Sequence, residues 1–525
     1  MIARDGVPRI VWHAHALTAG LLLGGLAVPG CAPPPPAAGY LVVGVASSPD
    51  NLDPRVGSDA ASQQIHQLVF NSLLKLDDRL DVVPDLATRW STPTDRTYVV
   101  EIRRGLTFHD GRPLTAVDVV YTFQSFLDPA FVSPRKGAYR LLASVRALDD
   151  HTIEFTLSEP FGSFPINLVM GIVPAGAGAE MARSPVGTGP YLVEEMRPDD
   201  RVTLRRFGDY VGQPARNPGL VLKVVPDDTM RGLELRKGTV DLVINDLSPD
   251  VVAQLEEDSA LRVLRAPGID YAYVGLNLRD PILADVRVRQ ALAHAIDREA
   301  IVAYLRRGLA RPAAGILPPS SWAFDPDGVT FPVDLDRARR LLDDAGYPDR
   351  DGDGPSARFR LTLRTSTAEF FRLQAAVIQQ DLARVGVDVE IRSTEFATLY
   401  ADVLRGNFQM YTLQWVGVTD PDMLRRVFHS EQMPPSGFNR GFYRNPDVDV
   451  LIDAATRSID YDERRTLYRR IQSLVAHDVP YISLWYKTNF IVAQRELEGL
   501  RVSPYIDFAQ LADVSARAPL ARVSP

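Results

Sequence analysis

The chain has 525 residues, of which 46% are hydrophobic and 24% are charged, and its formal net charge at pH 7 is −8. This composition is ordinary for a globular protein, and at about 150 residues per domain it allows roughly three domain-sized units. Because no basic block or stripe occurs along the sequence, we expect no nucleic acid among its partners.

The first residues differ from the rest of the chain. Arg4 and Arg9 precede an apolar run over 16–28 that is too short to span a bilayer comfortably, and the only cysteine, Cys31, follows it. The stretch 28–31 resembles a bacterial lipobox, which implies that residues 1–31 are a lipoprotein signal and that lipidated Cys31 anchors the protein. The alternative is a secretory signal with an incidental cysteine.

Residues 32–39 contain four consecutive prolines, which predict a short extended tether ahead of a folded body. The pattern of a buried strand follows at 40–45, and then a polar turn at 47–54. A helix with Ile65 and Leu68 on its apolar face comes next. This order is typical of the start of an α/β sheet.

The stretch 77–185 is predicted to form a separate α+β unit. Alternating hydrophobic residues predict strands at 97–103 and 152–157. Between them Thr115, followed three residues later by Asp118, predicts a capped helix start. The glycines at 187 and 189 then form a turn whose spacing fits no phosphate-binding loop.

Short strands at 220–225 and 241–244 flank a predicted helix over 230–236. After Pro267 the pattern restarts with a strand at 271–277 and one long amphipathic helix over 285–307. The later predicted elements are helices at 335–345, 371–385 and 462–476 and strands at 358–363, 387–391, 482–485 and 490–492. This βαβ succession predicts a second α/β domain.

Several stretches resemble, in the same order, the solute-binding proteins of peptide-type ABC importers (solute-binding protein family 5). They are 51–54, 84–90, Phe-His-Asp-Gly-Arg-Pro-Leu-Thr at 108–115, Val-Gly-Thr-Gly-Pro-Tyr at 186–191, 285–298 and 338–347. The resemblance extends from about Tyr40 to Phe508.

The resemblance implies an α/β fold of the type II periplasmic-binding-protein kind, with two lobes, a hinge and an inserted α+β subdomain. Lobe I would be residues 40–76, 186–266 and 489–518, with 77–185 inserted, and lobe II would be 267–488. The hinge would lie at 267–271 and 484–489. Solute would bind between the lobes, and closure would bury it.

The implied function is the extracytoplasmic component of an ABC importer, which captures a peptide or peptide-like solute and delivers it to the permease subunits. We expect a monomer without cofactor, lipid-anchored in the periplasm or at the cell surface. A sensor or chaperone on the same scaffold, or a binding protein for a sugar or a metal chelate, are the alternatives.

Enzymatic and metal-binding motifs are missing from the sequence. No Gly-x-Ser-x-Gly or His-Glu-x-x-His pattern occurs, so we expect no catalysis. The acidic stretch 349–354 resembles the start of a calcium loop, but Arg360 stands where a bidentate Glu is needed. The histidines lack ligand spacing, so no metal site is predicted.

The stretch 414–422 is predicted to be a strand-to-helix turn in the wall of the cleft. Trp415 would stack on the solute, or alternatively only pack a core, and Asp420 would bind solute or cap the next helix, of which we favour the cap. The full set of candidate ligand-binding residues is Ser47, Ser48, Asn51, Thr188, Tyr273, Asn277, Arg364, Ser366, Trp415, Val416, Gly417, Thr419 and Asp420.

Other candidates follow strand ends. Ser47, Ser48 and Asn51 follow the first strand, where open α/β sheets bind ligands, although such a turn also satisfies itself. In dipeptide-binding relatives an Arg near position 364 pairs with the ligand carboxylate, which implies this role for Arg364, with a solvated Arg as the alternative.

Val418 departs from the pattern of the dipeptide-binding relatives. Those proteins carry an Asp shortly after the equivalent Trp and Gly, and it pairs with the ammonium group of the ligand. Burying an ammonium without a partner costs several kcal/mol. The valine therefore disfavours binding of free-amine dipeptides and leaves longer peptides or another cargo open.

Overall fold

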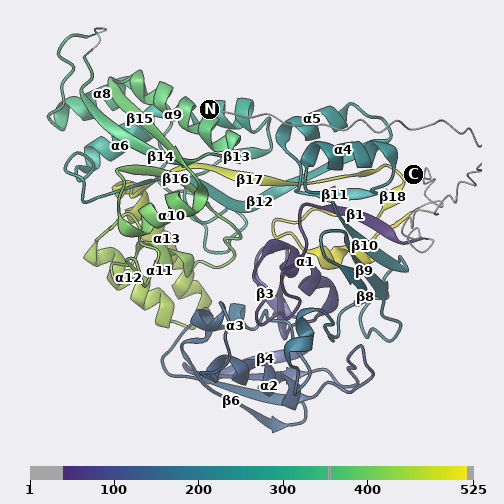
Figure 1. The fold of residues 1–525 in the computed structure, drawn as a ribbon. Coiled ribbons are helices and arrows are strands. Elements are labelled where there is room, and N and C mark those ends of the chain that lie inside the picture. The colour runs from purple at the N-terminus through teal and green to yellow at the C-terminus, as the bar shows by residue number, and fades with distance from the viewer. Residues whose placement is uncertain (1–38, 353, 355, 517–525) are drawn as a thin grey trace, which may run out of the picture. The chain divides into compact units, whose positions relative to one another are not determined.

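The computed structural model describes residues 39–352, 354 and 356–516 (Figure 1). The predicted signal, Cys31 and all but the last residue of the tether lie outside the described residues. Gly39 onward forms one compact unit by its contacts. Within 39–516, none of the helices combines the length and the low polarity needed to cross a bilayer.

The strands are β1 (Leu41–Val45), β2 (Leu74–Leu76), β3 (Val82–Pro84), β4 (Ala87–Thr94), β5 (Thr97–Ile102), β6 (Leu142–Asp149), β7 (Thr152–Leu157), β8 (Tyr191–Arg197), β9 (Arg201–Arg206), β10 (Gly219–Val224), β11 (Leu242–Ile244), β12 (Leu261–Leu276), β13 (Ala310–Pro312), β14 (Phe359–Ser366), β15 (Val387–Thr394), β16 (Met410–Trp415), β17 (Tyr481–Gln494), β18 (Leu497–Glu498) and β19 (Ser515–Ala516).

The α-helices are α1 (Ala60–Val69), α2 (Ala116–Leu127), α3 (Phe164–Asn167), α4 (Asp228–Lys237), α5 (Pro249–Glu256), α6 (Val286–Ala295), α7 (Arg298–Ala300), α8 (Leu335–Asp344), α9 (Glu369–Ala383), α10 (Phe396–Arg405), α11 (Met423–Phe428), α12 (Pro446–Arg457) and α13 (Tyr461–Asp478). Three short 3-10 helices, η1 (Lys136–Tyr139), η2 (Ala179–Ala182) and η4 (Phe508–Asp513), and one π-helical turn, η3 (Ile301–Leu305), complete the described elements.

An 11-stranded mixed sheet is the centre of the fold. Its order is β15-β14-β16-β12-β17-β11-β1-β10-β9-β8, and β13 pairs with β17 outside this path. The pairs β1–β10, β1–β11, β14–β15 and β14–β16 are parallel, as the βαβ pattern predicts. The other pairs of this sheet are antiparallel.

The long strands β12 and β17 join the two ends of this sheet (Figure 1). Their pairing runs from Leu261 opposite Gln494 to Gly275 opposite Tyr481, with a register shift between Pro267 and Tyr271. Pro267, after which a new strand is predicted, therefore lies inside the continuous strand β12. The two strands predicted at 482–485 and 490–492 are both parts of the continuous strand β17. The proline is accommodated because the ladder is irregular there.

The predicted hinge at 267–271 coincides with this register shift, but hinge motion and the division into lobes stay predictions. Separate hydrophobic cores do lie under the two ends of the large sheet. Residues 77–185, named the insert below, hold a four-stranded antiparallel sheet of order β4-β5-β7-β6. Phe123, Phe155 and their neighbours form its own core.

The prediction of a single long helix over 285–307 is wrong. Helix α6 ends at Ala295, Ile296 has an extended backbone, and Asp297 caps the short α7 by accepting a hydrogen bond from the Ala300 amide at 2.8 Å. The Asp297 amide donates to the Asp381 carboxylate at 2.9 Å. An aspartate that finds local backbone partners interrupts a helix that hydrophobic periodicity alone would continue.

Candidate functional site

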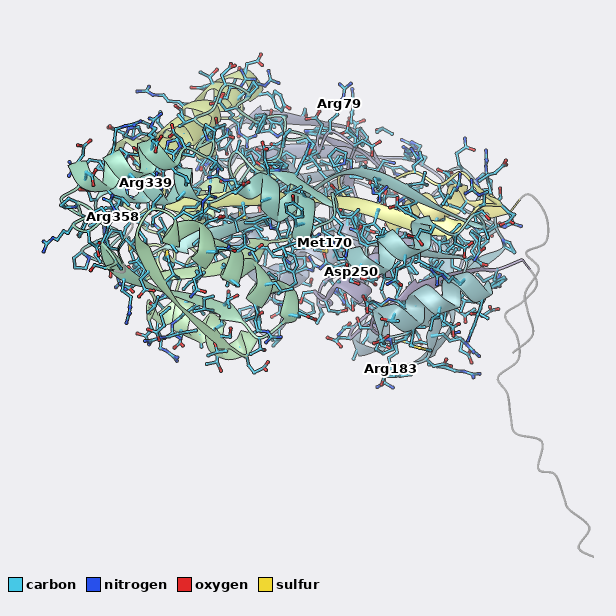
Figure 2. All side chains as sticks on the ribbon, turned by 90° about the horizontal axis from the view of Figure 1, so that it is seen from above. Arg79, Met170, Arg183, Asp250, Arg339 and Arg358 are labelled. Atoms are coloured by element: carbon cyan, nitrogen blue, oxygen red, sulfur yellow. The ribbon has the colours of Figure 1, made fainter. Side chains whose placement is uncertain are left out.

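Two adjoining cavities lie between the insert and the stretch 417–438, and together they are named the cleft below. Their volumes are about 620 and 330 Å³, which is the size range of small-molecule sites. They share lining residues from both walls, among them Arg135, Arg140, Asn167, Asp422 and Arg426. Met170 of the insert, labelled in Figure 2, lines the larger cavity.

The insert wall is held in place by an aromatic residue. Tyr139 of η1 is buried and stacks on Phe126 of α2 with the ring centroids 4.1 Å apart. Its hydroxyl donates to the Asn167 carbonyl at 2.9 Å, and the Asn167 amide side chain donates to the Ala138 carbonyl at 2.9 Å. These reciprocal bonds tie η1 to α3, so Arg135 and Arg140 are carried on a braced turn.

The opposite wall is the turn between β16 and α11. Gly417 has a φ of +68°, a backbone conformation that glycine adopts without strain. Its amide donates to the Asp270 carboxylate at 2.9 Å, which fixes the turn to β12. Val418 follows with a side chain only 1% exposed, packed in a hydrophobic core.

Two carboxylates, Asp420 and Asp422, line this wall. One oxygen of Asp420 accepts from the Ser163 hydroxyl and from the Asp422 amide, both at 2.8 Å. Burial raises the pKa of Asp420, while Arg464 opposes the shift. Burial, reinforced by repulsion from Asp420, raises the pKa of Asp422 to about 7. Near neutral pH the cleft thus holds less negative charge than two aspartates suggest.

Arginines dominate the remaining charge of the cleft. Arg425 forms an ion pair with Asp453 at 2.6 Å, and Arg135 donates to the Gly57 carbonyl at 2.8 Å. Arg140 and Arg426 are exposed, and their side chains form no ion pair or hydrogen bond with any residue in the described part of the chain. The cleft therefore presents cationic groups from both walls.

Direct hydrogen bonds close one edge of the cleft. The Gly162 amide of the insert donates to the Thr456 carbonyl of α12 at 2.9 Å. Arg464 of α13 donates to the Gly162 carbonyl at 2.9 Å and also bonds the Ser163 hydroxyl. A Cβ on Gly162 would lie 2.0 Å from the Ser458 carbonyl oxygen, so only glycine allows this close approach.

The chain was compared with protein families and with known proteins. The profile of bacterial extracellular solute-binding proteins, family 5 Middle, matches residues 81–433, which is more than half of the chain. The chain belongs to this family. The glutathione-binding protein GsiB of Shigella boydii is 30% identical over 491 residues, which cover 90% of this chain and 94% of the relative.

A further relative of this solute-binding family matches over a similar extent, both in its sequence and in its solved structure. The oligopeptide-binding protein AppA of Bacillus subtilis is 29% identical over 497 residues, which cover 90% of this chain and 91% of the relative. The solved structure of AppA from Bacillus subtilis with a nonapeptide has a TM-score of 0.74 at 27% identity, and the match covers 91% and 99% of the two chains. The predicted type II periplasmic-binding-protein fold is confirmed.

Trp415, which is predicted to stack on the solute, lies beside the cleft. It is half-buried, its ring meets Phe438 edge-on with the centroids 5.6 Å apart, and the Arg440 guanidinium lies 4.8 Å from its centroid. Phe438 lines the larger cavity. The buried indole Nε1 has no hydrogen-bond partner among the described residues, so this donor is unused. Contact with a solute stays a prediction.

The other candidates from this stretch divide into two groups. Gly417, Thr419 and Asp420 line the smaller cavity, while Val416 is 70% exposed. The favoured capping role of Asp420 needs a correction, because α11 begins at Met423 with Asp422 at its cap position. Asp420 instead accepts the Asp422 amide in a turn that precedes the helix.

Candidates near the first strand lie apart from the cleft. Asn51 lines a different cavity of about 890 Å³. The Ser48 hydroxyl accepts from the Asp199 amide at 2.7 Å, Ser47 is exposed, and buried Thr188 bonds the Asn71 side chain at 3.3 Å. Ser48 and Thr188 are thus bonded to residues distant in the chain and not within their own turns, and a role in binding solute stays a prediction.

Four candidates between 273 and 366 are engaged by the protein itself. Tyr273 has no exposed surface and stacks on Tyr271 and Tyr481. The Asn277 side chain donates to the Phe408 carbonyl at 2.8 Å, and Ser366 is buried. Arg364, implied to bind a carboxylate of the ligand, forms an ion pair with Asp402 at 2.8 Å. These side chains do not line the cleft in this conformation.

Sequence reasoning missed the cationic residues of the cleft. Arg425 and Arg426 stand directly after the turn that the sequence singled out, and that pair was the available signal. The sequence around Arg135 and Arg140 gave no such signal, because only the docking of the insert against the 417–438 stretch brings these arginines into the cleft. The inward position of Val418 was equally hidden.

Proposed function

We propose that this protein is the extracytoplasmic solute-binding component of an ABC importer, which captures a peptide or peptide-like solute in the cleft and delivers it to membrane permease subunits. The observation that carries the proposal is the pair of adjoining cavities whose walls come from the insert and from the 417–438 stretch. Two relatives, the oligopeptide-binding protein AppA at 29% identity and the glutathione-binding protein GsiB at 30% identity, support a peptide cargo.

A division into two lobes is part of this proposal. Lobe I would comprise 40–76, 186–266 and 489–518 together with the insert, and lobe II would comprise 267–488. The irregular pairing of β12 with β17 near Pro267 gives a place where the sheet could bend. A solute that contacts both walls favours the closed arrangement, because closure requires greater affinity for that state.

Binding measurements with the purified protein test the function. Mass spectrometry of solute that co-purifies with the protein, followed by calorimetric titration of peptides of two to nine residues, should reveal peptide binding with one site per monomer. Light scattering should show a monomer, and no peptide should be hydrolysed. Binding of sugars or metal chelates in place of peptides, or peptide turnover, would contradict the proposal.

Membrane attachment through Cys31 is a separate part of the proposal, supported by the lipobox-like stretch 28–31. In a bacterial host the full chain should fractionate with membranes and label with a fatty-acid analogue. Cys31→Ser should remove the label and release exported protein, because the thiol is the acceptor of the lipid. Unchanged membrane association of this variant would argue against the anchor.

A further inference from the structure

The charges of the cleft restrict the chemistry of its solute, on the assumption that the proposed binding function holds. Four arginines, Arg135, Arg140, Arg425 and Arg426, line the cleft, against two aspartates, Asp420 and Asp422. Only Arg425 of these arginines forms ion pairs with described residues, and its partners Asp453 and Glu431 lie outside the cleft lining. Positive charge therefore exceeds negative charge within the walls.

The donors of these arginines are incompletely used. The Nε atoms of Arg135 and Arg425 are buried without a hydrogen-bond partner among the described residues. Arg140 and Arg426, which line both cavities from opposite walls, form no side-chain hydrogen bond or ion pair with a described residue, although both attract the Asp422 carboxylate at longer range. A buried donor without a partner is destabilising, so a solute that supplies oxygen acceptors to the Nε atoms of Arg135 and Arg425 is favoured.

The aspartates offset this charge only in part. The Ser163 hydroxyl and the Asp422 amide already occupy one oxygen of Asp420. Asp422 has a pKa of about 7, because burial and the neighbouring Asp420 disfavour its charged form. Burial also lowers the pKa of Arg135, which indicates that its guanidinium lacks a compensating anion.

We propose that the cleft selects peptides carrying a compact anionic group, a side-chain or C-terminal carboxylate, which is held between Arg140 and Arg426. The planar guanidinium matches a carboxylate with two parallel hydrogen bonds, and one such group on each wall lets the anion bridge them. Closure of the cleft over the solute would exclude water and strengthen this attraction. The bridging anion also gives closure its differential affinity.

Matched peptides test the selectivity. We would titrate the mature protein with Ala-Ala-Glu-Ala-Ala and its Gln and Lys counterparts, each with a free and an amidated C-terminus. With the side-chain carboxylate as the recognised group, the Glu peptide should bind at least about tenfold more tightly than the Gln peptide, and the Lys peptide should bind most weakly. The amidated series distinguishes the sources, since amidation weakens binding only if the terminal carboxylate is the recognised group.

Variants then locate the recognition. Arg140→Gln and Arg426→Gln should each weaken the preferred acidic peptide about five- to tenfold, and their effect on its neutral counterpart should be small. Both side chains are exposed, so the melting temperature of the free protein should not change. Arg183→Gln is the matched control, because this exposed arginine lies outside the cleft and is labelled at the surface in Figure 2.

The outcomes separate this inference from the proposed function. Equal affinities for neutral, acidic and basic peptides, unchanged in the Arg140 and Arg426 variants, would overturn the anion inference and leave peptide binding intact. Absence of binding to any peptide would overturn the proposed function itself. A preference for acidic peptides that survives both substitutions would place the anion elsewhere and also overturn the inference.

Discussion

The fold changes the ionisation of Asp422 in the cleft. Its pKa is raised to about 7 by burial and by Asp420, although Arg425, Arg426 and Arg140 pull it down. In the unfolded chain the carboxyl group would titrate near 3.9. The folded state thus binds this proton more tightly, and the free energy of unfolding falls as pH rises from about 4 through about 7.

Replacing Asp422 by Asn should remove this loss of stability. The melting temperature of Asp422→Asn should be close to that of the natural protein at pH 4.5 and clearly higher at pH 8, because the amide carries no charge at either pH. Differential scanning calorimetry at both pH values measures the effect. Asp209→Asn, at an exposed site, is the control and should shift neither value. If Asp422→Asn shifted the melting temperature equally at both pH values, the raised pKa of Asp422 would be contradicted.

The unused donor of Trp415 can be tested in the same way. Trp415→Phe retains an aromatic ring beside Phe438 and Arg440 but removes the buried Nε1. A net hydrogen bond of about 0.5–1.5 kcal/mol corresponds to roughly two- to tenfold in affinity. We expect peptide binding to weaken within this range, while the melting temperature of the free protein changes little.

Calorimetric titration and thermal melting of Trp415→Phe measure both quantities. Trp90→Phe, which alters a half-buried indole of the insert away from the cleft, provides the comparison. If Trp415→Phe stabilised the free protein and left peptide affinity unchanged, the indole would be a core residue with an unsatisfied donor.

At the scale of elements, helix α13 carries one of the contacts between the insert and the opposite wall of the cleft. Arg464 is 6% exposed, lies 5.2 Å from the Trp322 ring centroid and bonds Gly162 and Ser163. Breaking one side of such a buried polar contact leaves the other side unpaired. Arg464 is therefore expected to contribute to the stability of the folded protein.

Arg464→Gln should lower the free energy of unfolding by about 3 kcal/mol, because the Gly162 carbonyl, Ser163 and nearby Asp420 lose their cation. Urea unfolding monitored by circular dichroism measures this difference. Arg470→Gln on the same helix is exposed and should change it by less than about 0.5 kcal/mol. Similar effects of the two substitutions would show that the contact contributes little.

For the whole molecule, the packing of Gly162 against the α12–α13 connection decides whether the cleft is closed at that edge. Gly162→Ala places a Cβ 2.0 Å from the Ser458 carbonyl oxygen, and neither backbone can yield without separation. We expect a larger radius of gyration by small-angle scattering and faster peptide dissociation. Gly208→Ala has open space around its Cβ and should change neither quantity. Unchanged scattering of Gly162→Ala would contradict this edge contact.

Local pattern determined much of the fold. Strand periodicity at 97–103 and 152–157 predicted β5 and β7, and the Thr115–Asp118 pair predicted the start of α2, where the Asp118 carboxylate accepts from the Thr115 amide at 2.8 Å. Family membership also followed from short motifs. These features depend on residues near one another in the chain, so the sequence alone contains them.

Tertiary structure alone decided the chemistry of the cleft. Val418 and Asp420 are two residues apart, yet one enters a core and the other lines a cavity, because the Gly417 turn is fixed by distant Asp270. The meeting of Arg140 with Arg426 and the raised pKa of Asp422 also arise only when the insert docks. Periodicity records which residues are buried, but charge, distance and desolvation between remote segments depend on how those segments pack.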